Sequence, residues 1–171
     1  CGFIYEIYNN KTKLRYAVKK MIANNIVALE GFQREFEIVH QNPHEGILDI
    51  YGVCVKCINE TNYELYVLMD LAIHDWEVEI IQRQEIKNYY PESELITILK
   101  QLTSALYFLQ KEKSIAHRDI KLENILVCKY NMYKLGDFGD AKRKTESKVR
   151  KSLKGTDIYM SPLLYSGLKH G

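Results

Sequence analysis

The amino-acid sequence predicts an α+β fold, in which a strand-rich first part carries one helix and the second part is mainly helical. Residues 14–21 have the pattern of a strand, and residues 65–71 (LYVLMDL) have the continuous apolar pattern of a buried strand. Between them, apolar side chains recur with the helical period over residues 32–39. A longer helical period covers residues 91–110, where Pro91 and the acidic residues after it are typical of a helix start.

The composition fits one globular domain. The chain has 171 residues, of which 46% are hydrophobic and 27% are charged, so a substantial apolar core can form. A net charge of +2 is too small to indicate a nucleic-acid or membrane partner. No apolar run reaches the roughly 20 residues of a membrane span, and no signal-peptide pattern opens the chain. We therefore expect an intracellular, cytoplasmic location, with no nucleic-acid or membrane partner.

Two of the four cysteines form a C-x-x-C pair, Cys54 and Cys57. Zinc sites and redox sites need further partners, and the sequence contains no second such pair. We therefore interpret both cysteines as ordinary strand residues.

The first strand and the helix after it each carry a charged residue on an apolar face. Lys19 lies among small and apolar neighbours on one face of the strand. On the helix, Phe32, Phe36 and Val39 are spaced i, i+4 and i+7, and Glu35 falls in the same arc. A lysine that extends its ammonium group to the surface is the ordinary explanation for Lys19. A carboxylate on an apolar stripe, however, needs a cationic partner, because burying it unpaired is costly.

The chemistry is concentrated in two motifs, HRDIKLEN at residues 117–124 and DFG, which begins thirteen residues after the first motif ends. Asp119 can accept the proton of an attacking hydroxyl, and Lys121 can neutralise charge on a moving phosphoryl group. Asn124 and Asp137 offer oxygen ligands of the kind that Mg²⁺ prefers. Both motifs in this order, with a spacer of β-hairpin length, predict phosphoryl transfer from ATP.

These motifs match the catalytic loop and the magnesium loop of eukaryotic protein kinases, so the chain resembles a kinase, and Lys121 resembles the serine/threonine signature. The resemblance implies a two-lobed fold: a small antiparallel β lobe with one helix, and a mainly helical large lobe that is incomplete at its C-terminal end. Residues 1–72 would form the small lobe and hinge, and residues 73–171 the start of the large lobe through the activation segment. The implied signalling reaction uses ATP and Mg²⁺ to phosphorylate serine or threonine hydroxyls of protein substrates.

The resemblance also assigns residues of the first part to ATP. Ala17 and Lys19 lie in a segment similar to the kinase lysine strand, and Glu35 is similar to the glutamate of the partner helix. This implies a Lys19–Glu35 ion pair that holds the α- and β-phosphates. Gly2 would be the third glycine of the phosphate loop, whose first two glycines are not in this chain, and Ile4 would lie over the adenine ring.

Four further residues would complete the adenine pocket: the gatekeeper, two hinge residues and the floor. In that order they are Met69, Asp70, Ala72 and Leu126. The hinge contacts are made by main-chain groups, so side-chain identity is weakly informative at those two positions. The resemblance also implies that Phe138 is an apolar plug, which stacks with His117 between the lobes.

Two departures from the family pattern leave a second function open. Leu163 stands where the family usually has a glutamate, and the sequence stops at Gly171, before the last helices of the family domain. The alternative is therefore a truncated or pseudokinase-like binding module without catalysis, and a small-molecule kinase is a third possibility. The presence of all six family residues favours catalysis. They are Lys19, Glu35, Asp119, Lys121, Asn124 and Asp137.

Residues 142–154 are strongly basic and have three interpretations. The segment is a solvated loop, a nucleic-acid patch that lacks interleaved aromatic residues, or an activation loop ordered by phosphorylation. The resemblance implies a regulatory phosphate on Ser152, bound by Arg118. It also assigns Gly155 and Thr156 to the loop that grips the acceptor segment. The pattern indicates no oligomeric state.

Overall fold

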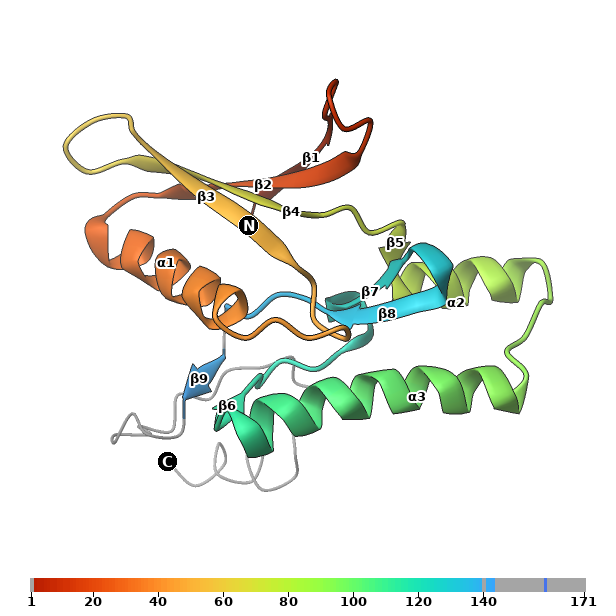
Figure 1. Cartoon of the computed structure of the whole chain (residues 1–171). Coiled ribbons are helices and arrows are strands. Elements are labelled where there is room, and N and C mark those ends of the chain that lie inside the picture. Colours follow the sequence, from red (N-terminus) through yellow and green to blue (C-terminus); the bar gives the residue numbers. More distant parts are fainter. Residues whose placement is uncertain (1, 140, 144–158, 160–171) are drawn as a thin grey trace.

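The computed structural model describes residues 2–139, 141–143 and 159, and these form the two lobes of an α+β fold, as predicted (Figure 1). The first lobe is a four-stranded antiparallel sheet in the order β1-β2-β4-β3, with helix α1 against one face. Its elements are β1 (Gly2–Tyr8), β2 (Arg15–Ala23), α1 (Ile26–His40), β3 (Ile50–Cys57) and β4 (Tyr63–Asp70).

Helix α1 begins earlier than the predicted segment. Asn25 caps it, because its side-chain oxygen accepts a hydrogen bond from the N–H of Ala28 at 2.8 Å. Ile26 and Val27 in the first turn are apolar although they are exposed, so the sequence shows no amphipathic period at the start of the helix. The side chains that the helix buries are Leu29, Ile38 and Val39.

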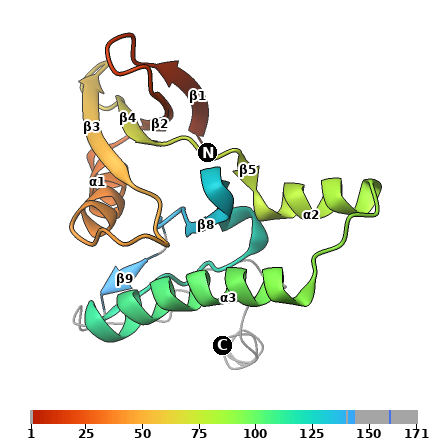
Figure 2. The same cartoon turned by 45° about the vertical axis from the view of Figure 1, so that its right-hand side comes forward.

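The second lobe combines two helices with short strands (Figure 2). The helices are α2 (Trp76–Glu85) and α3 (Glu92–Tyr107), and α3 continues into a π-helical turn, Phe108–Glu112. The strands are β5 (His74–Asp75), β6 (Ile115–Ala116), β7 (Ile125–Cys128), β8 (Met132–Leu135) and β9 (Lys142–Arg143), with 3₁₀ turns at Leu122–Asn124 and Lys129–Asn131. The strands β5, β7 and β8 form one sheet in that order, and β6 pairs with β9.

The long helix predicted over residues 91–110 corresponds to α3, which begins directly after Pro91. It buries Ile98, Leu102 and Ala105. Leu95 and Leu99 belong to the predicted apolar face, yet they are exposed, Leu99 by 53%. A helical period marks an apolar arc, but it does not tell which part of a wide arc other elements cover.

Strand β8 is tied to the small lobe through the segment between α1 and β3. Ile47 forms an isolated parallel bridge with Leu135. The N–H of Leu48 donates to the carbonyl of Leu135 at 2.9 Å, and the N–H of Leu135 donates to the carbonyl of Gly46 at 2.8 Å. Ile50, at the start of β3, packs against both apolar cores of the molecule. The two lobes are therefore joined by main-chain hydrogen bonds as well as by the chain itself.

Some predicted features lie outside the described residues. They are the assignments of Ser152, Gly155, Thr156 and Leu163. Within the described part of the chain, no helix is both long enough and apolar enough to span a membrane. Cys54 and Cys57 lie in β3, as predicted for strand residues, and both are exposed free thiols.

We predict that two isoleucines of α3 respond very differently to truncation. Ile98 is 1% exposed and Ile96 is 43% exposed, so they form a matched pair on one helix. Ile98→Ala should lower the free energy of unfolding by about 2–5 kcal/mol, because it leaves a cavity in the core. Ile96→Ala should change it by less than about 1 kcal/mol. Urea unfolding followed by circular dichroism measures both, and equal losses would contradict the packing described for α3.

Candidate active site

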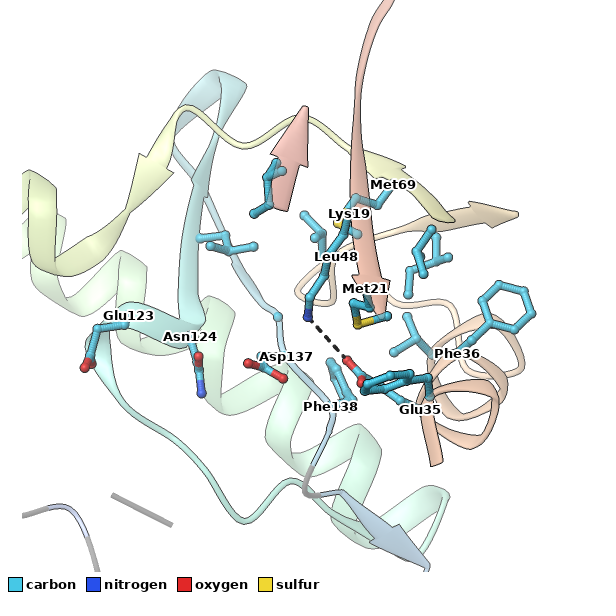
Figure 3. Close-up of a pocket in the computed structure, with 17 residues that line it drawn as sticks. Lys19, Met21, Glu35, Phe36, Leu48, Met69, Glu123, Asn124, Asp137 and Phe138 are labelled. Atoms are coloured by element: carbon cyan, nitrogen blue, oxygen red, sulfur yellow. Dashed lines mark ion pairs between the residues drawn. The ribbon is translucent and has the colours of Figure 1, made fainter. Parts of the chain in front are cut away.

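A cavity of about 240 Å³ lies where the small-lobe sheet, α1 and the β7–β8 hairpin meet (Figure 3). Most of its walls are apolar, whereas its charged and amide side chains come from β2, α1 and the two ends of the hairpin. Seven of the predicted site residues line it. They are Ile4, Lys19, Glu35, Met69, Asn124, Leu126 and Asp137.

Lys19 on β2 and Glu35 on α1 form the predicted ion pair, with 3.9 Å between Nζ and Oε1 (Figure 3). Their side chains are only 25% and 15% exposed. Each charge therefore offsets part of the desolvation cost of the other. Since Lys19 lines the cavity and an ammonium carries three donors, it can also donate to an anionic ligand there.

The catalytic-loop residues form one hydrogen-bonded unit. The amide of Asn124 donates to the main-chain oxygen of Asp119 at 2.8 Å and to its Oδ2 at 2.9 Å. Lys121 Nζ lies 3.2 Å from the same Oδ2. The hydrogen bond to Asp119 raises the pKa of Lys121 above its usual value, so the ammonium form is favoured. Asp119 and Lys121 do not line the cavity itself, but Asn124 connects them to it.

The β7–β8 hairpin brings Asn124 and Asp137 together. Asn124 directly precedes β7, Asp137 follows β8 by two residues, and the two strands pair in register. The N–H of Gly136 donates to the carbonyl of Asn124 at 2.9 Å, which closes the hairpin at its open end. A Cβ on Gly136 would lie 2.8 Å from Leu126 Cδ1, so glycine allows this close approach. The hairpin predicted from the spacer length is confirmed.

The loop after β8 fixes the direction of Asp137. Its Oδ1 accepts a hydrogen bond from the N–H of Gly139 at 3.3 Å. Phe138 is 2% exposed and its ring contacts that of His117, with 4.7 Å between the ring centroids. His117 Nε2 lies 3.0 Å from the carbonyl oxygen of Gly136. The predicted contact between His117 and Phe138 is therefore present, and it anchors both motifs to each other.

Four further predicted residues do not line the cavity: Gly2, Ala17, Asp70 and Ala72. Ala17 is buried on β2, opposite Met69 on β4. Asp70 is the last residue of β4, and its N–H donates to the carbonyl of Asp49 at 3.0 Å. A main-chain contact between Asp70 and an adenine would therefore use the carbonyl oxygen of Asp70.

Gly2 has a packing reason to be glycine. It is the first residue of β1 and lies opposite Met21 in the pairing with β2. A Cβ at this position would come within 2.7 Å of the main-chain oxygen of Lys20. Ile4, two residues further along β1, pairs with Lys19 and lines the cavity, although it is 68% exposed.

Several residues of the cavity were not predicted from the sequence. Met21 and Phe36 line it, and their signal was present, because they share apolar faces with Lys19 and Glu35 (Figure 3). Glu123 lines it as well, and its Oε2 is buried with no hydrogen-bond partner among the described residues. Nothing in the pattern around Glu123 distinguishes it from an ordinary neighbour of Asn124.

The oxygen ligands at the polar end of the cavity suit a Mg²⁺ ion that also binds phosphate oxygens. Asn124 and Asp137 provide an amide oxygen and a carboxylate, which are hard oxygen ligands. Across the described residues, no group of three or more histidine, cysteine, aspartate and glutamate side chains could hold a metal ion. Mg²⁺ commonly takes one or two protein ligands and completes its shell with water and phosphate oxygens. The residues present therefore fit a magnesium nucleotide.

Comparison with known proteins identifies the family. The protein kinase domain matches residues 1–171. Serine/threonine-protein kinase 36 of Pongo abelii is 39% identical over 137 residues, which are 80% of this chain and 10% of that protein. Serine/threonine-protein kinase PLK4 of Drosophila persimilis is 32% identical over 157 residues, which are 89% of this chain and 19% of that protein. Serine/threonine-protein kinase 33 of Bos taurus is 32% identical over 174 residues, covering 94% and 34% of the two chains.

The chain thus spans between 10% and 34% of the length of these relatives. The match extends over the whole sequence, and the described residues form the two lobes, with Asn124 and Asp137 of the two motifs lining the cavity between them. On these findings, the chain belongs to the protein kinase domain family and is related to its serine/threonine-specific members.

Proposed function

We propose that this chain transfers the terminal phosphoryl group of ATP to serine or threonine hydroxyls of protein substrates. The observation that supports this most strongly is the convergence of ligand groups from both lobes on one cavity. The small lobe contributes the Lys19–Glu35 ion pair, and the large lobe contributes Asn124 and Asp137. A non-catalytic binding module is less well supported, because it would not need all of these groups together.

The adenine would lie between Ile4 and Leu126, with Met69 at the inner wall. Apolar walls with a few directed polar groups are typical of sites for flat heteroaromatic ligands. The carbonyl of Asp70 and the N–H of Ala72 would provide those polar groups at the adenine edge.

The triphosphate would extend from there toward Lys19. The ammonium would donate charge-assisted hydrogen bonds to the α- and β-phosphate oxygens, while Glu35 holds it in place. Asn124 and Asp137 would hold Mg²⁺ through their side-chain oxygens. Bound there with the nucleotide, the metal ion supplies positive charge that stabilises the phosphate oxygens during transfer.

Asp119 would accept the proton of the substrate hydroxyl. As it does so, the hydroxyl oxygen bonds to the γ-phosphorus, and the bond from that phosphorus to the bridging oxygen of ADP breaks. The 2.9 Å hydrogen bond from Asn124 orients the Asp119 carboxylate for this task. Lys121, which is held in its charged form, would offset negative charge on the transferred group.

The proposal includes the organisation and setting of the domain. Residues 1–72 would form the small lobe and hinge, and residues 73–171 the start of the large lobe through the activation segment. The partners would be proteins that present serine or threonine to the cavity mouth. A cytoplasmic location is part of the proposal, because the reaction consumes ATP.

Lys19→Met should remove most of the binding of Mg-ATP. We expect millimolar Mg-ATP to raise the Tm of the wild-type protein by several degrees, because the ligand binds only the folded state. In Lys19→Met this increase should fall to less than about half, since the phosphates lose a charged donor. Lys129→Met is the matched control, because Lys129 is exposed at the turn of the β7–β8 hairpin. Absence of any wild-type increase would rule out the nucleotide site.

Asp119→Asn should lower kcat by about 10²- to 10⁴-fold, because the amide cannot accept the hydroxyl proton. The KM for ATP should change less than about threefold, since Asp119 does not line the cavity. Steady-state phosphorylation of a degenerate serine/threonine peptide library measures both constants. Glu85→Gln, at an exposed carboxylate of α2, is the control and should behave as wild type. Wild-type turnover in Asp119→Asn would show that another group takes the proton.

A further inference from the structure

A cluster of charged side chains outside the cavity joins the end of β4 to β8. Lys134 Nζ lies 2.8 Å from Asp49 Oδ2 and 2.9 Å from Asp70 Oδ2. The hydroxyl of Tyr51 donates to the other carboxylate oxygen of Asp70. The Lys134 side chain is only 13% exposed, so its two ion pairs are better shielded from solvent than a surface pair.

Lys134 holds two carboxylates close together. Burial alone would raise the pKa of Asp70, but hydrogen bonds from Tyr51 and Lys134 outweigh this effect and lower the pKa below its usual value. Asp49 bonds to the same ammonium. Without the ammonium, two negative charges would remain side by side in a partly desolvated place, and they would push their segments apart.

The cluster fixes the main chain at the edge of the cavity. Asp70 directly follows the cavity residue Met69 and precedes Ala72 by two positions. Its N–H bonds to the carbonyl of Asp49 at 3.0 Å, while its side chain bonds to Lys134 and Tyr51. The orientation of the Asp70 carbonyl is therefore set by contacts on both its main chain and its side chain.

Of the segments that the cluster joins, the chain directly after β4 is held less firmly than β8. Strand β8 pairs with β7 on one edge, and Leu135 bonds to residues 46–48 on the other. Asp70 is also paired on both edges, opposite Tyr16 of β2 and through its N–H to Asp49, but it is the last residue of β4, and residues 71 and 72 lie outside the strands. Loss of the ammonium should therefore displace the segment of residues 70–72 rather than β8 and Asp137.

We propose that Lys134 is a positioning residue for adenine recognition. By drawing Asp49 and Asp70 onto one ammonium, it holds the carbonyl of Asp70 and the N–H of Ala72 where they meet the adenine edge. This inference rests on the proposed nucleotide site, and it names Lys134 as the residue that fixes the adenine end of that site. Lys134 touches neither the phosphates nor the hydroxyl acceptor in this scheme.

The test compares two probes that report on opposite ends of the nucleotide. Adenosine reports on residues 70–72, and Mg-tripolyphosphate reports on Lys19 and Asp137. Isothermal titration calorimetry on the whole chain should show that Lys134→Met weakens adenosine binding about five- to tenfold, a loss typical of one misaligned hydrogen-bonding edge. Its affinity for Mg-tripolyphosphate should stay within about twofold of wild type. Lys19→Met should show the reverse pattern.

Two control variants make the outcome decisive. Lys134→Arg should retain adenosine binding within about threefold, because its guanidinium can still bridge two carboxylates. Lys129→Met, from the same hairpin, should bind both probes as wild type does. A merely structural role would weaken both probes equally in the folded protein, and that result, or unchanged adenosine binding in Lys134→Met, overturns the proposal. If the wild-type protein binds neither probe, the proposed function fails and this inference fails with it.

Discussion

The arrangement of the site depends on Leu135, whose strand is paired on both edges. On one side it belongs to β8 and pairs with Ile125 of β7, and on the other side it bonds to the segment before β3. These bonds hold a large-lobe hairpin against the small lobe at the point where the chain enters the cavity. Asp137 comes two residues later, so its position relative to Lys19 is set by main-chain geometry. Main-chain hydrogen bonds suit this task, because they leave little freedom of register.

Charge pairing then determines which charged side chains can lie in and beside the cavity. Lys19 and Glu35 are mostly buried as a pair, and either one alone would face a large desolvation cost. Lys134 satisfies two carboxylates that come from the small lobe. Such pairs add little net stability, but they strongly disfavour arrangements in which one partner is separated from the other. The Lys19–Glu35 pair therefore specifies how α1 lies against the small-lobe sheet, and the two Lys134 pairs specify how the lobes meet.

The sequence predicts the parts of this structure that are local and misses those that are distant along the chain. The motif around Asp119, the β7–β8 hairpin and the Lys19–Glu35 pair could be predicted, because each follows from spacing, periodicity or a short motif. Cys54 and Cys57 were expected to be strand residues, but the bounds of β3 could not be predicted, since none of its residues is fully buried and it lacks a clear alternation. The Lys134 cluster joins residues 85 and 64 positions apart, and no periodicity reports such a contact. The exposed Leu99 shows the reverse case, in which a correct helical period does not tell what covers the helix.

Two of the described residues with positive φ angles lie next to the proposed chemistry. Arg118 and Asp137 have positive φ angles of 72° and 53°, a conformation that costs a non-glycine residue about 1–2 kcal/mol. Glycine at position 137 would relieve the strain, but it would also remove the oxygen ligand, and aspartate tolerates this conformation better than most residues. Arginine is not favoured in this conformation, so neighbouring residues must hold the main chain of Arg118 at its positive φ angle. His117 does this from one side, since Nδ1 accepts from the N–H of Asp119 at 3.4 Å while Nε2 donates to the carbonyl of Gly136. One imidazole thus connects the strained turn that presents Asp119 to the strand end that presents Asp137, which explains why a buried histidine serves this position better than an apolar residue of similar size.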